Sequence, residues 1–275
     1  MTHRVQYNPY LHTATAYLLL VECLARPSSV LDTPLPKLAP DRSPLAAPRF
    51  RPTEQQRHRV ERLLRDAQGL PPDGAERPLR KPFIIVNPNA SDMLPLRKWP
   101  SANVVELVEL LLQCAEAGTV IVSGSASERD AVEAMFAKVA SPRIVNLAVR
   151  TELVDLITLY SMADVMVTND SGPAHFATLA DLPCVVLFGP ETPRLFGPMG
   201  SHVRVLYAKL ACSPCVNVFN HRFSPCTDNA CMQAITVDAV FNEVRAILAA
   251  GRQAGGQVEQ AGLVGRAGED PAAGS

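Results

Sequence analysis

The run Asn169-Asp170-Ser171-Gly172-Pro173-Ala174-His175 is the segment best suited to bind an anionic ligand. It follows the apolar run 164–168 (DVMVT) and precedes a stretch of helical length, so a strand is expected to end and a helix to begin there. Helix N-termini present unpaired N–H groups and the positive end of a dipole, which together bind phosphate. Gly172 would let a ligand approach the backbone, and Ser171 and His175 could donate hydrogen bonds. The alternative is that Asp170 or Ser171 merely caps the helix.

Three further loops follow apolar runs and carry polar groups. Arg97-Lys98-Trp99-Pro100 comes after the run 83–87 (FIIVN), and its cations could neutralise a diphosphate and stabilise it as a leaving group. Glu128, in the loop 123–129, could accept hydrogen bonds from a ribose or a base. The loop 189–193 (GPETP) is stiffened by its prolines and contains Thr192. The alternative for Arg97 and Lys98 is that they belong to a solvated loop. The alternative for Glu128 is that it complements the dipole of the helix that follows.

Apolar runs and amphipathic stretches alternate from residue 83 to residue 188, which is the pattern of βαβ units. Five strands are predicted, at 83–87, 119–123, 144–146, 164–168 and 184–188, with helices between them. The predicted fold is α/β, a doubly wound, open parallel sheet. Because the carboxyl ends of parallel strands meet at one edge, the four loops are expected to converge there. Neither G-x-G-x-x-G after the first strand nor G-x-x-x-x-G-K-[ST] occurs, which disfavours a nicotinamide or flavin enzyme and an ATPase.

Composition narrows the class of protein. Twenty-six Lys and Arg stand against 27 Asp and Glu in 275 residues, a balance that gives a general nucleic-acid binder no electrostatic basis. Residues 1–80 are Pro-rich and look helical only at 11–25 and 54–68, residues 81–250 carry the βαβ pattern, and 251–275 are small, polar and predicted to be a disordered tail. No run reaches the roughly 18 apolar residues of a membrane span, and no signal peptide is recognised. A soluble protein of a reducing compartment is expected.

Four of the seven cysteines are clustered in the sequence, at Cys212, Cys215, Cys226 and Cys231. Four soft ligands within twenty residues could hold a structural, tetrahedral Zn²⁺ ion, with His221 as a substitute ligand. The alternative is four reduced, partly buried thiols.

Three motifs together resemble glycosyltransferase family 9, the ADP-heptose:lipopolysaccharide heptosyltransferases and their relatives, over residues 83–248. The run 169–175 is similar to the family's D-[ST]-G-x-x-H signature, and 188–194 (FGPETPR) is similar to its F-G-P-T-x-P loop. The run 97–100 (RKWP) is similar to its K-x-W-P segment, with Arg97 where the family usually has lysine. An arginine keeps the charge but changes its geometry.

The resemblance implies a GT-B architecture, in which two Rossmann-like domains face a cleft and the C-terminal one binds the donor. It implies inverting transfer of a sugar, a heptose, from an ADP-heptose-like donor to a lipid-linked saccharide of the lipopolysaccharide core, without a catalytic metal. Carried over to this sequence, the resemblance gives seven donor-binding residues, six of them with a role. Ser171, Gly172 and His175 would hold the diphosphate. Asp170 would bind the sugar hydroxyls, Arg97 the phosphates or the sugar, and Glu128 the nucleoside. Thr192 is the seventh donor-binding residue.

The resemblance also implies that the catalytic base belongs to an acceptor-binding domain, of which residues 1–80 look like a remnant followed by a linker. The resulting hypothesis is a transferase in the cytoplasm, at the inner face of the inner membrane, with peripheral membrane contact left open. Two alternatives remain. One is a catalytically incomplete fragment that binds a nucleotide sugar, and the other is a zinc-stapled interaction protein whose loops only cap helices.

Overall fold

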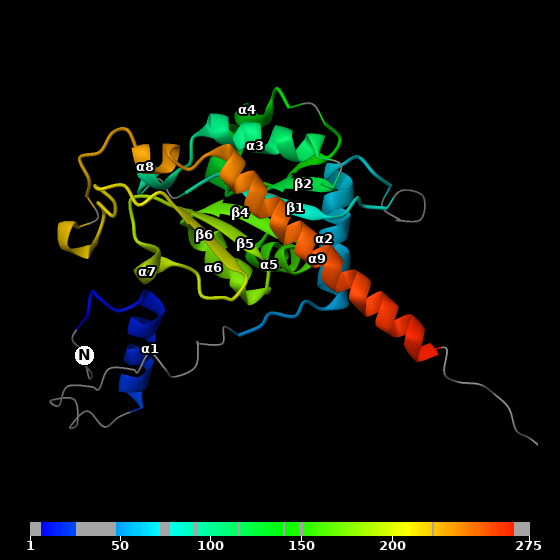
Figure 1. Cartoon of the computed structure of the whole chain (residues 1–275), viewed down its shortest axis with the longest axis horizontal. Helices are drawn as coiled ribbons and strands as arrows, with labels where there is room; N and C mark the ends of the chain where they lie inside the picture. Colours follow the sequence, from blue (N-terminus) through cyan, green and yellow to red (C-terminus); the bar gives the residue numbers. More distant parts are fainter. Residues whose placement is uncertain are drawn as a thin grey trace, which may run out of the picture.

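The chain is built on a six-stranded parallel sheet of order β3-β2-β1-β4-β5-β6 (Figure 1). The computed structural model describes residues 7–25, 48–71, 78–90, 93–114, 116–139, 141–148, 151–221 and 223–266. The strands are β1 (Phe83–Asn87), β2 (Thr119–Val122), β3 (Ile144–Asn146), β4 (Val165–Asn169), β5 (Cys184–Phe188) and β6 (Val203–Tyr207). The order reverses direction between β1 and β4, which is the position where open sheets of this kind bind ligands.

Helices lie before, between and after the strands. They are α1 (Thr13–Leu24), α2 (Glu54–Ala67), α3 (Ser101–Gln113), α4 (Arg129–Phe136), α5 (Leu153–Met162), α6 (Gly172–Leu179), α7 (Pro193–Phe196), α8 (Ala230–Gln233) and α9 (Val237–Arg266). Short 3₁₀ turns lie at η2 (Pro95–Arg97), η3 (Ala126–Glu128) and η4 (Val218–Asn220).

Two hydrophobic cores cover the two faces of the sheet, because successive side chains of a strand point to opposite faces. Ile84 and Val86 of β1 belong to the core shared with α3 and α9. Phe83 and Ile85 belong to the other core, shared with α2, α5 and α6. Figure 1 shows α9 lying across the sheet. Central strands buried on both faces explain the unbroken apolar runs of the sequence.

The predicted fold class is confirmed, and the five predicted strands and the helices between them are present. The sequence reading missed β6, an edge strand whose side chains are mostly partly or fully exposed and therefore gave no continuous apolar signal. The prediction of a disordered tail differs from the structure for residues 251–266, because α9 continues to Arg266. Adding residues to an already nucleated helix is easy, so the Ala, Gln and Glu residues there can extend it despite the glycines. Residues 267–275 lie outside the described part.

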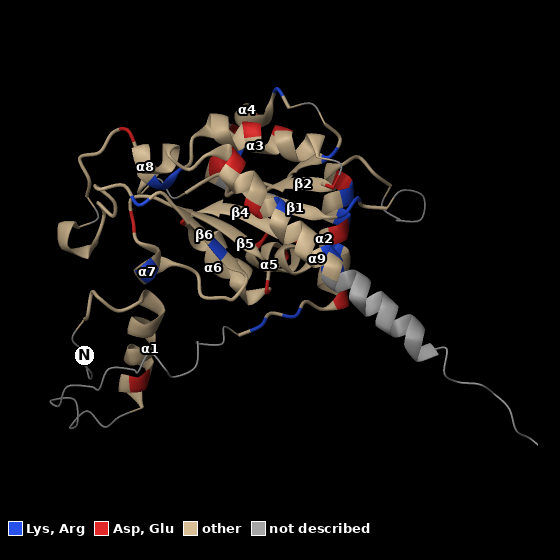
Figure 2. Ribbon diagram, viewed as in Figure 1, with Lys and Arg blue, Asp and Glu red and all other residues tan. Residues whose placement is uncertain are grey.

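Helix α1 carries a large apolar surface. Glu22 is its one charged residue, so Figure 2 shows a single acidic segment and no basic segment on it. Tyr17, Val21 and Leu24 are 65%, 63% and 69% exposed. A groove of about 560 Å³, lined mainly by apolar side chains, separates α1 from α7 and the loop that follows α7. Among the described residues, no helix combines the length and the apolar character that a membrane crossing requires.

His12 attaches the start of α1 to that loop. Its Nδ1 accepts a hydrogen bond from the Ala14 N–H at 3.2 Å, and its Nε2 lies 2.9 Å from the Gly197 carbonyl oxygen. Since a carbonyl oxygen only accepts, Nε2 is the donor in the contact with Gly197. Both ring nitrogens are therefore used to hold α1.

We expect Gly118→Ala to destabilise the fold, because a Cβ at this position would lie 2.3 Å from the backbone carbon of Lys81. Overpacking against backbone should cost about 2 kcal/mol or more of unfolding free energy, measured by urea denaturation. The matched control is Gly251→Ala in α9, where a Cβ would meet nothing within 4 Å. It should gain about 0.5–1 kcal/mol from helix propensity. Equal stability of the two variants would contradict the packing argument.

Candidate functional site

The turn between β4 and α6 leaves the start of the helix open. Ser171 is the N-cap residue, in extended conformation, and its side chain makes no capping hydrogen bond. Its hydroxyl donates instead to the Asn169 carbonyl oxygen at 3.2 Å. Apart from its chain neighbours and the backbone of α6, the nearest described residue to a Cβ on Gly172 would be Phe176, at 3.9 Å. Pro173 has no N–H and the Ala174 N–H donates to the Ser171 carbonyl oxygen at 3.1 Å, so the Gly172 N–H is the backbone donor that this turn offers, beside open space. The side chain of Ser171 does not cap the helix, which disfavours that alternative.

Asn169, at the end of β4, fixes this turn to the loop that follows β1. Its amide nitrogen donates to the Pro88 carbonyl oxygen at 2.8 Å, and its amide oxygen accepts from the Trp99 N–H at 3.2 Å. The Trp99 indole donates in turn to the Ile235 carbonyl oxygen at 2.9 Å. The loop that carries Arg97 is thus held at both ends.

A cavity of about 460 Å³ opens at this edge of the sheet. Six of the seven predicted donor-binding residues line it, and they come from the loops after β1, β2 and β4 and from α6: Arg97, Glu128, Asp170, Ser171, Gly172 and His175. The convergence expected from the sequence is therefore present. Thr192 is not among the lining residues, because its hydroxyl accepts from the Arg194 N–H and caps α7.

Glu191, next to Thr192, lines the cavity in its place and was not singled out from the sequence. It is 2% exposed, and its Oε2 lies 3.4 Å from Nη1 of Arg97. Oδ2 of Asp170 lies 3.8 Å from the same nitrogen. The signal that could have found Glu191 is a carboxylate directly after a buried strand, at the edge where the other polar loops meet.

Acidic side chains outnumber basic ones around the cavity. Its described lining contains four carboxylates, from Glu128, Glu152, Asp170 and Glu191, and one guanidinium, from Arg97. Carboxylates accept hydrogen bonds from hydroxyls, whereas a phosphate needs donors. The donors of the lining include the start of α6, Arg97 and the Asn89 amide nitrogen, which is buried and has no hydrogen-bond partner among the described residues.

Glu128 is partly used by its own loop. Its Oε2 accepts from the Ser125 N–H at 2.7 Å, and its backbone N–H donates to the Ser125 carbonyl oxygen at 3.1 Å. Complementing a helix dipole is therefore not all that the Glu128 side chain does. The carboxylate closes the loop and also borders the cavity.

His175 lies at the rim shared by this cavity and the groove beside α1. Desolvation by the surrounding protein lowers the pKa of His175 below its usual 6.5, and nearby His12 lowers it further. His175 is thus neutral at pH 7 and can donate one hydrogen bond without adding a charge.

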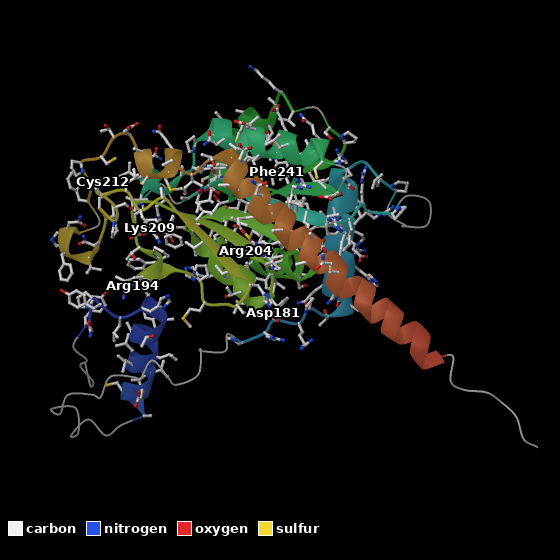
Figure 3. All side chains as sticks on the ribbon, viewed as in Figure 1. Asp181, Arg194, Arg204, Lys209, Cys212 and Phe241 are labelled. Atoms are coloured by element: carbon white, nitrogen blue, oxygen red, sulfur yellow. The ribbon has the colours of Figure 1, made fainter. Side chains whose placement is uncertain are left out.

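The four bunched cysteines do not form a metal centre in the described structure. Cys212 and Cys226 are exposed, Cys215 is intermediate and Cys231 is buried. Burial raises the pKa of the Cys231 thiol, and Cys215 and Cys212 add to the effect. Within the part of the chain that is described, no three His, Cys, Asp or Glu side chains gather closely enough to bind a metal ion. Figure 3 places Cys212 on the loop that follows β6. Zinc stays a prediction that this geometry does not support.

A doubly wound parallel sheet with an uncapped helix start at its carboxyl edge defines an α/β protein whose cavity is suited to a phosphate-containing ligand. The family model described as glycosyltransferase family 9 (heptosyltransferase) matches residues 32–222. The chain therefore belongs to glycosyltransferase family 9.

Relatives of known name agree with this assignment. Lipopolysaccharide heptosyltransferase 2 of Salmonella typhimurium is 33% identical over 129 residues, which are 46% of this chain and 36% of that protein. The Escherichia coli protein of the same name is 31% identical over 129 residues, again 46% of this chain and 36% of that protein. The chain thus spans about a third of the length of these curated relatives.

The fold is similar to that of two solved structures. E. coli ADP-heptose lps heptosyltransferase II has a TM-score of 0.64 at 22% identity, covering 91% of this chain and 66% of that one. A family 9 glycosyl transferase from Veillonella parvula has a TM-score of 0.63 at 17% identity, covering 90% of this chain and 62% of that one. At these identities the likeness shows the fold alone.

We expect His175 to make the folded state sensitive to acid. Because its pKa is lowered in the folded protein, the unfolded chain takes up a proton first as the pH falls through 6.5, and folding stability falls with pH. Urea denaturation of wild type and His175→Asn at pH 8 and pH 5.5 measures this effect. Wild type should lose more unfolding free energy than the variant over that interval. An equal or smaller loss in wild type would contradict the assignment.

Metal analysis decides the zinc prediction. If the four sulfurs close around zinc, purified protein should contain about one zinc ion per chain. A Cys212→Ser/Cys215→Ser double variant should then lose the metal. Protein purified without chelators that lacks near-stoichiometric zinc would end the prediction.

Proposed function

We propose that the cavity binds a nucleotide-diphosphate sugar, of the ADP-heptose class, and that the chain is the donor-binding part of a glycosyltransferase. The sugar, a heptose, would pass to a lipopolysaccharide-core-type acceptor by inverting displacement. The observation that carries the proposal is the uncapped start of α6, which faces the same cavity as Arg97 and Glu128. Membership of family 9 supports it.

The distribution of charge fits a ligand with one anionic centre between two groups rich in hydroxyls. The Gly172 N–H and the positive end of the α6 dipole would hold the diphosphate together with neutral His175. The Ser171 hydroxyl would join them by turning away from the Asn169 carbonyl oxygen. Arg97 would add the positive charge that stabilises a diphosphate leaving group. Asp170 would accept hydrogen bonds from the sugar and Glu128 from the nucleoside, because a carboxylate next to the diphosphate itself would repel it.

In the displacement, an acceptor hydroxyl attacks the anomeric carbon while the bond from that carbon to the diphosphate oxygen breaks. A general base takes the hydroxyl proton, and the nucleoside diphosphate leaves with the bonding electrons. We propose that the base comes from an acceptor-binding part, and that residues 1–80 contain the end of that part and a linker. The exposed apolar face of α1 supports this division, because a helix with apolar residues around most of its circumference is usually packed on several sides.

A second candidate function is nucleotide-sugar binding without catalysis. It is favoured by one observation: the described residues build the cavity assigned to the donor, and binding without catalysis requires that cavity alone. We place the protein at the cytoplasmic face of the inner membrane under either proposal, where both a nucleotide sugar and a lipid-linked acceptor are accessible.

Calorimetric titration with ADP and ADP-heptose, followed by an assay for ADP release, tests the proposal. Both candidate functions predict binding. Only the transferase predicts that ADP-heptose is converted to ADP when a lipopolysaccharide-core acceptor is added. A folded protein that binds neither ligand would contradict both and would favour a zinc-stapled interaction protein.

We expect Gly172→Ala to weaken ADP binding without weakening the fold. The added methyl group meets no described atom closer than 3.9 Å, so the folded protein accommodates it, but it occupies space beside the proposed diphosphate. The dissociation constant should rise about tenfold, which corresponds to roughly 1.4 kcal/mol. Gly251→Ala, remote from the cavity, is the matched control and should bind like wild type. Unchanged affinity in Gly172→Ala would place the diphosphate elsewhere.

A further inference from the structure

We propose that Glu191 is a positioning residue, which holds the Arg97 guanidinium in the orientation that meets the anionic part of the ligand. This inference rests on the proposed donor site. Glu191 would not touch the diphosphate itself, and it would act through Arg97.

The contact between Arg97 and Glu191 joins loops from two strands that are separated by one strand of the sheet. Arg97 follows β1 and Glu191 follows β5, and Asp170 follows β4, which lies between those strands in the sheet. Nη1 of Arg97 is 3.4 Å from Oε2 of Glu191 and 3.8 Å from Oδ2 of Asp170. The three side chains, in the order Arg97, Asp170 and Glu191, are 15%, 6% and 3% exposed. Water screens such contacts poorly, so the geometry of the guanidinium is set by its carboxylate neighbours.

Both of these carboxylate contacts use the same nitrogen of Arg97. A guanidinium has five N–H donors on three nitrogens. Nε of Arg97 is buried and has no hydrogen-bond partner among the described residues. Burial closes Nε off from the cavity, but neither carboxylate contact uses Nη2, so the guanidinium keeps a nitrogen that can donate to an anion.

The backbone of Arg97 is held as firmly as its side chain. Its N–H donates to the Leu94 carbonyl oxygen at 3.2 Å, within the 3₁₀ turn η2. On the next residue, the Lys98 carbonyl oxygen accepts from the Asn229 amide at 2.9 Å. With both ends of the arginine fixed before the ligand arrives, little side-chain entropy remains to be lost on binding.

Charge and position have opposite effects at Glu191, and this makes the inference testable. As a buried negative charge near the ligand, Glu191 should weaken anion binding. As the anchor of Arg97, it should strengthen it. Glu191→Gln and Glu191→Met remove the charge equally and keep the length of the side chain, but only glutamine can still accept a hydrogen bond from Arg97.

The experiment measures ADP and ADP-heptose dissociation constants by calorimetry for wild type and the two variants, with thermal melting as the check on folding. We expect Glu191→Gln to stay within threefold of wild type or to bind more tightly. Glu191→Met should bind both ligands at least tenfold more weakly than wild type, although it removes the same negative charge as Glu191→Gln. In an Arg97→Ala background the Gln and Met variants should have the same affinity, since the anchored group is gone.

Equal affinities of Glu191→Gln and Glu191→Met in the Arg97 protein would overturn the inference. So would a difference between them that persists in Arg97→Ala. Either result, with wild type binding ADP, leaves the proposed function intact. Failure of wild type to bind ADP or ADP-heptose would instead overturn the proposed function, and the positioning role with it. If Glu191→Met does not melt cooperatively, Glu191→Leu replaces it in the same comparison.

Discussion

The side chain of Asn169 is the contact on which the rest of the site depends. Its amide nitrogen donates to Pro88 and its amide oxygen accepts from Trp99, both in the loop after β1. The carboxyl ends of the adjacent strands β1 and β4 are therefore fixed relative to each other. An amide is required for this, because one end must donate and the other accept. The turn into α6 starts at this residue and the loop of Arg97 is held by it. The relative placement of helix start and cation follows from a single buried polar side chain.

The sequence predicted the central fold because buried parallel strands and amphipathic helices leave strong, different signals. Asp170, Ser171 and Gly172 could be placed at the cavity because the carboxyl ends of parallel strands must share an edge. Edge strand β6 could not be recognised in this way, since its exposed positions break the apolar run. The extension of α9 past residue 250 depends on a helix already formed before it, which local composition does not reveal.

Glu191 and Thr192 show the limit of motif reasoning within the site. The motif drew attention to the loop after β5, but not to which of two neighbouring polar residues turns inward. In the structure Thr192 caps α7, and this leaves the preceding residue, Glu191, facing the cavity. The choice is made by where a four-residue helix begins, and that boundary follows from Pro193 and from packing rather than from the motif. Figure 3 shows Arg194 on this short helix.

The link between His12 and Gly197 has a mechanical consequence. Phe196, the residue before Gly197, lines both the groove beside α1 and the cavity at the sheet edge. One imidazole therefore connects the first turn of α1 to a wall that both hollows share. A polypeptide that packed on the exposed apolar side of α1 and shifted the helix would displace this wall. Binding at α1 would then change the shape of the cavity in which the nucleotide sugar is proposed to bind.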